Sequence, residues 1–206
     1  MPFSIELGQD WSALQQELLA LATNARDVND ATQFLTGNGS SAPCGILNIG
    51  GTGSLSTTQR VQTATVATYA IGDPWALSAA LPPRFRSVAT YAAAPGTWDT
   101  TYRFVGGNST EPYQFGNASR AGDFLGRPKV EWSTMGTGAT TGTKLIIAGD
   151  FSKYYIVDRL GTTAELIPHL FGASNRYPTG QRGLYVYGRT GAAVTALNAF
   201  RYLEVK

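Results

Sequence analysis

The chain has 206 residues, of which 43% are hydrophobic and 15% are charged, and its formal net charge is +2. This composition supplies enough apolar side chains for a sizeable core and excludes an intrinsically disordered chain. The small charge gives no support for a nucleic-acid-binding patch, and no apolar run approaches the roughly 18 residues of a membrane-spanning helix.

A long amphipathic helix is predicted for residues 11–34. Its apolar residues recur at spacings of three and four, which places them on one stripe of the helix surface. The stripe consists of Trp11, Leu14, Leu18, Leu21, Ala25 and Val28. The run Gly37-Asn38-Gly39 ends the helix. Because one helix cannot bury such a stripe alone, we expect it to pack on a sheet or on another protein.

The middle of the chain is predicted to alternate short helices, strands and loops. Asp73 is expected to cap a helix whose first residue is Pro74, and Pro82 and Pro83 end that helix. The predicted elements are a loop at 37–58, helices at 73–81 and 94–105, strands at 86–93 and 125–135, and a loop at 106–121.

The last third of the chain is predicted to be mostly β-structure. The candidate strands are 145–148, 154–159, 164–171, 184–187 and 200–205. Helices and strands follow one another without a regular βαβ rhythm, which favours the α+β class. We also expect Asp150 to accept hydrogen bonds from turn amides, and Arg159 to form a charge pair either within the chain or across an interface.

One segment resembles a phosphate-binding loop but lacks its spacing. Residues 136–144 read GTGATTGTK, whereas the phosphate loop requires Gly-Lys-Ser/Thr at the start of a helix. Here Thr143 separates Gly142 from Lys144, and an apolar strand follows, so no helix N-terminus is available to hold an anion. The segment is therefore interpreted as a flexible hairpin.

Other candidate chemical groups also have simpler explanations. With His169 and Cys44 as the only histidine and cysteine, the chain cannot form a usual zinc site. No carboxylate is evident to orient a Cys–His dyad, and His169 is expected to be an ordinary strand residue. A glycosidase pair built from distant carboxylates stays open. The dispersed carboxylates are Asp73, Asp99, Asp123, Asp150, Asp158 and Glu165.

Four tyrosines lie in candidate strands and could stack on sugars or bases. They are Tyr154, Tyr155, Tyr185 and Tyr187. Tyrosine is also enriched at protein interfaces, which favours strands that meet other subunits. We therefore predict no catalytic residue, no cofactor-binding residue, no metal-binding residue and no cofactor.

Several spaced segments match one known protein family in order. They are FLTGNGSSAPCGIL, LGRPKVEWSTM, LIIAGDFSKYYIVDRLGTTAEL and GQRGLYVYGRTGAAVTALNAFRYLEV. Together they resemble the tailed-bacteriophage major capsid proteins of the Hong Kong phage type, from about residue 10 to residue 206. The resemblance implies an α+β phage major capsid fold with a long spine helix. It assigns residues 1–46 and 149–206 to a peripheral domain and residues 47–148 to an axial domain.

The same resemblance implies a structural protein and not an enzyme. The expected function is a head subunit of a tailed phage or prophage that self-assembles into an icosahedral shell. The expected partners are other copies in pentamers and hexamers, with scaffold or portal proteins, and DNA enclosed without sequence-specific binding. The expected location is the virion, and the host cytoplasm during assembly, with no membrane contact.

One departure from the family and two alternatives accompany this interpretation. The family's N-terminal arm and extended loop match no segment before residue 11, so we expect a truncated core that is monomeric or weakly oligomeric. Covalent cross-linking is not assigned. An encapsulin-type nanocompartment shell protein would share the fold and enclose cargo proteins instead of DNA. A carbohydrate-binding or hydrolytic domain would use the tyrosines and the scattered carboxylates.

Overall fold

The computed structural model describes residues 2–4, 11–104, 123–174 and 176–206, with backbone alone at 2–4, 11–15 and 160. The chain divides into two compact units. We call Met1–Thr32 with Ile156–Gly191 the hairpin unit, and Gln33–Tyr155 with Ala192–Lys206 the core unit. The predicted loop at 106–121 lies outside the described residues.

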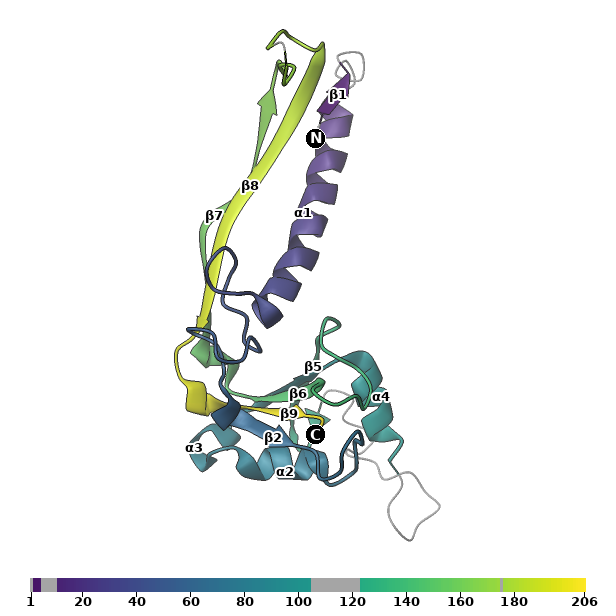
Figure 1. The fold of residues 1–206 in the computed structure, drawn as a ribbon, viewed down its shortest axis with the longest axis vertical. Helices are drawn as coiled ribbons and strands as arrows, with labels where there is room; N and C mark the ends of the chain where they lie inside the picture. The colour runs from purple at the N-terminus through teal and green to yellow at the C-terminus, as the bar shows by residue number, and fades with distance from the viewer. Residues whose placement is uncertain (1, 5–10, 105–122, 175) are drawn as a thin grey trace. The chain divides into compact units, whose positions relative to one another are not determined.

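A six-stranded mixed sheet forms the centre of the core unit (Figure 1). Its strands, in order across the sheet, are β2 (Arg60–Gln62), β9 (Phe200–Glu204), β6 (Lys144–Gly149), β3 (Thr90–Ala93), β5 (Arg127–Glu131) and β4 (Asp123–Phe124). The central strand β6 pairs antiparallel with both β3 and β9. Five consecutive residues of β6 are buried, because both faces of the sheet are covered.

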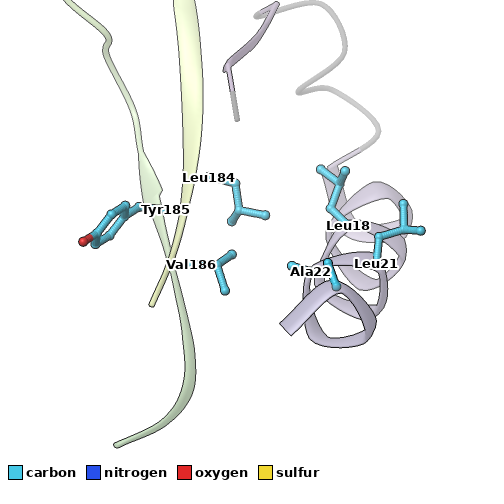
Figure 2. A pocket seen from close by; sticks show the side chains of 7 residues that line it. Leu18, Leu21, Ala22, Leu184, Tyr185 and Val186 are labelled. Atoms are coloured by element: carbon cyan, nitrogen blue, oxygen red, sulfur yellow. The ribbon is translucent and has the colours of Figure 1, made fainter. Parts of the chain in front are cut away.

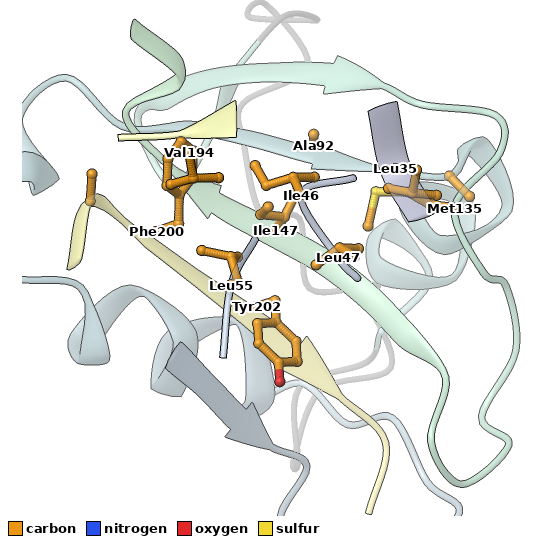
Figure 3. Packing of buried hydrophobic residues seen from close by; sticks show 12 residues of the cluster. Leu35, Ile46, Leu47, Leu55, Ala92, Met135, Ile147, Val194, Phe200 and Tyr202 are labelled. Carbon is orange, nitrogen blue, oxygen red and sulfur yellow. The ribbon is translucent and has the colours of Figure 1, made fainter. Parts of the chain in front are cut away.

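Different kinds of structure cover the two faces of this sheet. On one face, Leu77 of α2 (Asp73–Ala80) and Trp98 of α4 (Pro95–Tyr102) pack in a cluster with Leu145. On the other face, Ile46 and other residues of the loop after the long helix pack on β6 and β9 (Figure 3). This loop was predicted, but nothing in its composition showed that it would form half of the core.

Short helices in the core unit begin at or next to proline, as predicted. The predicted helices at 73–81 and 94–105 are confirmed by α2 and α4. The predicted capping by Asp73 is wrong: Asp73 is itself helical, and its carboxylate accepts from the amides of Ala64 and Ala70 at 3.0 and 2.8 Å. The remaining short elements are α3 (Pro83–Arg86) and the 3₁₀ helices η2 (Thr57–Gln59), η3 (Phe151–Lys153) and η4 (Leu197–Ala199).

The hairpin unit consists of one helix and a three-stranded sheet. The sheet order is β1 (Pro2–Ser4), β8 (Gln181–Val194) and β7 (Tyr154–Ile167), and β7 and β8 run side by side in opposite directions (Figure 1). The predicted long helix is confirmed as α1 (Trp11–Thr36), which ends directly before Gly37. Among the described residues, no helix is long and apolar enough to cross a membrane.

The sheet of the hairpin unit covers only part of the predicted helix stripe. Leu21 is 58% exposed and Val28 is 69% exposed, Ala25 is also exposed, and Leu18 is half-buried. The side chains of Trp11 and Leu14 lie outside the described residues. The periodicity therefore identified a helix correctly, and packing on another protein stays the prediction for the exposed part of the stripe.

Several predicted strands differ in extent from the observed ones. The candidate at 154–159 and residues 164–167 of the candidate at 164–171 form the single strand β7, and β8 extends well beyond 184–187. Residues 168–171 lie beyond the end of β7, so the prediction that His169 is a strand residue is wrong. Residues 136–144 are not a hairpin, because β5 and β6 both pair with β3 instead of with each other. The last strand, β9, pairs inside the core unit, so the division by contact differs from the expected boundaries at residues 47 and 148.

Candidate functional site

The residues considered for catalysis or anion binding form no common site. Cys44 donates its thiol to the Thr52 carbonyl at 2.8 Å, and His169 is exposed just beyond the end of β7. Asp150 accepts from the Ser152 amide at 3.0 Å, which confirms its predicted turn role. Lys144 begins β6, so a strand and not a helix follows the phosphate-loop-like segment. In the described part of the chain, no three His, Cys, Asp or Glu residues gather where they could hold a metal ion.

The end of α1 is held by backbone groups from the loop that follows it. The amides of Ile46 and Leu47 donate to the carbonyls of Phe34 and Leu35, at 2.9 and 2.8 Å. These carbonyls belong to the last turn of the helix and have no partner within it. The returning loop thus satisfies the C-terminus of α1 with tertiary hydrogen bonds, and it begins inside the motif FLTGNGSSAPCGIL.

Tyr154, the first residue of β7, also binds the end of α1 and the loop that follows it. Its hydroxyl donates to the carbonyls of Phe34 and Cys44, at 3.1 and 2.8 Å. Its ring meets the Phe34 ring edge-on, and burial raises the pKa of Tyr154. Tyr154 was predicted to lie on a strand surface that meets other subunits, but this half-buried ring packs within its own chain.

We expect Tyr154→Phe to lower the free energy of unfolding by about 1–2 kcal/mol, because two carbonyls lose their donor while the ring is kept. Urea denaturation followed by tryptophan fluorescence measures the change. The neighbouring Tyr155 is 54% exposed, so Tyr155→Phe is the matched control and should change stability by less than about 0.5 kcal/mol. Equal losses in the two variants would contradict the anchoring role.

In the hairpin unit, Arg26 connects α1 to β7. Its guanidinium donates to Thr162 Oγ1 at 2.7 Å and to Asp30 Oδ2 at 3.2 Å, and lies 3.9 Å from Asp158 Oδ1. Gly188 of β8 makes this possible, since a side chain there would overlap the guanidinium. The predicted charge pair of Arg159 is not found among the described residues, whereas its neighbour Asp158 has one.

An apolar groove lies between α1 and β8. It has a volume of about 490 Å³ and is lined by Leu18, Leu21, Ala22, Ala25, Leu184, Tyr185 and Val186. Figure 2 shows Leu184 and Val186 pointing toward the helix, whereas Tyr185 points away. The helix and the sheet therefore meet through few side chains, and part of the predicted stripe stays open.

The most unusual property of the hairpin unit is its exposed apolar surface. Large exposed side chains are Leu21, Val28, Ile156, Val157, Leu166, Ile167, Phe171, Tyr177 and Tyr185. Consecutive residues Ile156 and Val157 are both exposed, so neither face of β7 is covered there. Extended apolar surfaces of this kind mark protein–protein interaction sites. This surface, which we call the hairpin surface, is the candidate functional site.

Comparison with known proteins agrees with a role in assembly. A model of the phage capsid family matches residues 1–205. The chain belongs to the phage capsid family. It is a structural protein, a major capsid subunit, and it has the α+β capsid fold with a long spine helix. The resemblance of the spaced motifs to this family is thereby confirmed. No curated protein sequence matches the chain significantly.

Solved capsid structures share the fold of this subunit at low sequence identity. The capsid of a native GTA particle has a TM-score of 0.80 and 19% identity, over 99% of this chain and 70% of that chain. Gordonia phage Cozz has a TM-score of 0.64 and 15% identity, over 100% and 68%. An encapsulin complex from Synechococcus elongatus PCC 7942 has a TM-score of 0.60 and 13% identity, over 98% and 70%.

Two features of the capsid subunit were missed by sequence reasoning. The hydrogen bonds from Tyr154 to the carbonyls of Phe34 and Cys44 join segments far apart in the sequence, and no local sequence pattern predicts them. The contacts of Arg26 with Thr162 and Asp158 also join segments far apart in the sequence. An arginine on the polar side of an amphipathic helix is usually solvated, so its position alone gave no signal.

Proposed function

We propose that this capsid subunit self-associates through the hairpin surface into pentamers and hexamers, which close an icosahedral shell around DNA. The observation that carries the proposal is the number of large apolar side chains that the hairpin unit leaves exposed on its helix and strands. Near-equivalent use of one self-complementary set of surfaces is what closes a symmetric shell. The similar GTA capsid was solved with C5 symmetry, which supports the pentamers.

We further propose that the hairpin unit corresponds to the peripheral domain and the core unit to the axial domain. The expected boundaries were 1–46, 47–148 and 149–206. The proposal moves residues 33–46, 149–155 and 192–206 to the axial domain, because they belong to the core unit. Val194 and Phe200 are buried with Ile147 of the central strand, which supports this assignment.

The subunit is proposed to act without enzymatic chemistry and without a cofactor. Its carboxylates serve the fold: Asp73 binds two amides, and Glu165 accepts from the Tyr187 hydroxyl, which raises the pKa of Tyr187. DNA would be enclosed without sequence-specific contacts, in keeping with the small net charge. Scaffold and portal proteins are proposed partners during assembly in the host cytoplasm, before the subunit is part of the virion.

An encapsulin-type shell is the second candidate, because an encapsulin structure shares the fold. The GTA capsid superposes more closely, with a TM-score of 0.80 against 0.60, which favours the phage-type shell. The content of assembled particles separates the two candidates. Nuclease-protected DNA would support the phage-type shell, and a protected protein cargo without DNA would support the encapsulin type.

Val28→Lys tests the role of the hairpin surface in assembly. Because Val28 is 69% exposed and lysine is a good helix former, we expect an unchanged melting temperature. A charge placed in an apolar contact between copies should weaken association at least tenfold. Sedimentation velocity across a concentration series measures the association of the parent and Val28→Lys chains. Negative-stain imaging of the same fractions shows which particles they form. Equal association of the parent and Val28→Lys chains would contradict the role of the hairpin surface.

A further inference from the structure

The outer edge of β7 is the feature that the assembly proposal leaves unexplained. In the hairpin unit, β7 lies at the side of the sheet, and no strand in the described part of the chain pairs with its other edge. The strand spans 14 residues, Tyr154–Ile167. A long edge strand with exposed apolar side chains is a template for pairing with another chain, and proteins normally shorten it, charge it or cover it.

The two faces of β7 can be told apart from its contacts. Thr162 and Asp158 contact Arg26 of α1, so even-numbered residues face the helix. Odd-numbered residues therefore lie on the opposite face. There, Glu165 accepts a hydrogen bond from Tyr187, which stacks on Tyr185. Tyr185 points away from α1 in Figure 2, in agreement with this assignment.

Pairing of β7 with β7 of a second copy is possible only in certain registers. Two antiparallel edge strands related by a two-fold axis keep the same side chains on the same face only if the axis is normal to the sheet. The axis then passes midway between one residue and the same residue of the second copy, and these two residues face each other. Centring on Asp158 or on Arg159 would place like charges directly opposite each other, which destabilises a sheet.

Centring on Thr162 gives a self-complementary edge. Arg159 then lies opposite Glu165 of the second copy, and Val157 lies opposite Ile167. Each of these pairs occurs twice because of the symmetry. All four side chains are exposed in the single chain, and all four lie on the face away from α1. Opposite charges and apolar groups in directly facing positions both stabilise antiparallel sheets.

We infer that the subunit contains a second-copy docking edge, in which residues 157–167 of two β7 strands pair antiparallel about Thr162. The inference rests on the proposed self-association and specifies one of its contacts. The two-fold axis leaves both α1 helices on the same face of the joined six-stranded sheet. The exposed Leu21 and Val28 of one helix are then on the same side as those of the other.

Cysteine cross-linking tests the register directly. Facing residues in an antiparallel pair have Cα atoms about 4.5–5.5 Å apart, within the span of a disulfide. Thr162→Cys should therefore form a disulfide between residues 162 of two copies under mild oxidation. Thr163→Cys is the matched control, because residue 163 faces Gly161 of the second copy and the two new thiols would be a diagonal pair. Peptide mapping distinguishes these disulfides from any made by Cys44.

Charge reversal tests the proposed pairs in the same assay. In the Thr162→Cys background, Arg159→Glu should lower the yield of the disulfide at least fivefold, because two glutamates then face each other across the edge. The double change Arg159→Glu and Glu165→Arg should restore the yield by exchanging the two charges. If the Thr162→Cys chain does not fold, the Arg159→Glu change and the double change are made in the parent chain. Sedimentation then measures how strongly each variant associates.

The outcomes separate this inference from the proposed function. Particles or oligomers that form without the 162–162 disulfide would overturn the β7 pairing and leave self-association standing. Equal yields from the Thr162→Cys and Thr163→Cys chains, or no recovery in the double variant, would also overturn the pairing. Absence of any association would overturn both. A 162–162 disulfide that follows the charge series supports the docking edge.

Discussion

Gly45→Ala is expected to lower the free energy of unfolding by about 1–3 kcal/mol, the usual cost of forcing an extra methyl group into close packing. A Cβ atom at Gly45 would overlap the Gly37 amide nitrogen and would lie 2.6 Å from the carbonyl carbon of Thr36. Both are backbone atoms at the end of the helix, so neither can rotate away. The Gly45 amide also donates to the Gly37 carbonyl at 2.9 Å, and a shift of this loop would break that bond.

Chemical denaturation followed by circular dichroism measures this loss. Gly72→Ala is the matched control: Gly72 has φ −75°, and no atom lies within 4 Å of the Cβ that would be added. The control should stay within about 0.5 kcal/mol of the parent chain. If both variants lose the same stability, close backbone packing is not what requires glycine at position 45.

Trp98→Ala is expected to cost about 3–5 kcal/mol, the range for truncating a buried aromatic ring. Trp98 is 1% exposed, and its ring packs on Phe124 with a centroid separation of 4.9 Å. Its indole nitrogen donates to the Val130 carbonyl at 3.3 Å. Truncation would leave a cavity between α4 and the sheet and would remove the donor from a carbonyl of β5.

Thermal unfolding monitored by near-ultraviolet circular dichroism measures the effect. Trp75→Ala is the matched control, because Trp75 is 50% exposed on α2 and leaves no enclosed cavity. We expect its loss to be less than half that of Trp98→Ala. Similar losses from both tryptophans would mean that the packing of α4 on the sheet contributes little to stability.

Local elements were predictable where neighbouring residues decide them. The 3.6-residue periodicity of residues 11–34 and the Gly37-Asn38-Gly39 stop predicted α1, and prolines predicted the starts of α2 and α4. The unbroken apolar run Leu145–Ala148 predicted the central strand β6. The spaced motifs predicted the capsid family, because their order along the chain is itself a sequence property.

The assembly of these elements depended on contacts that no local pattern encodes. The hairpin expected at residues 136–144 was wrong because β3, from much earlier in the chain, lies between β5 and β6. The predicted stripe of α1 is largely exposed in the single chain, because periodicity identifies an apolar face but not which part of it the chain's own sheet covers.

The sequence by itself determined the type and order of the main helices and strands and the family of the chain. Hydrogen bonds within a helix, turn residues and apolar runs act over a few residues, so their pattern is readable in one dimension. Only the tertiary structure decided that β9 returns to the core unit, that Tyr154 holds the end of α1, and that β7 lies at the edge of its sheet. Each of these depends on atoms brought together from distant parts of the chain.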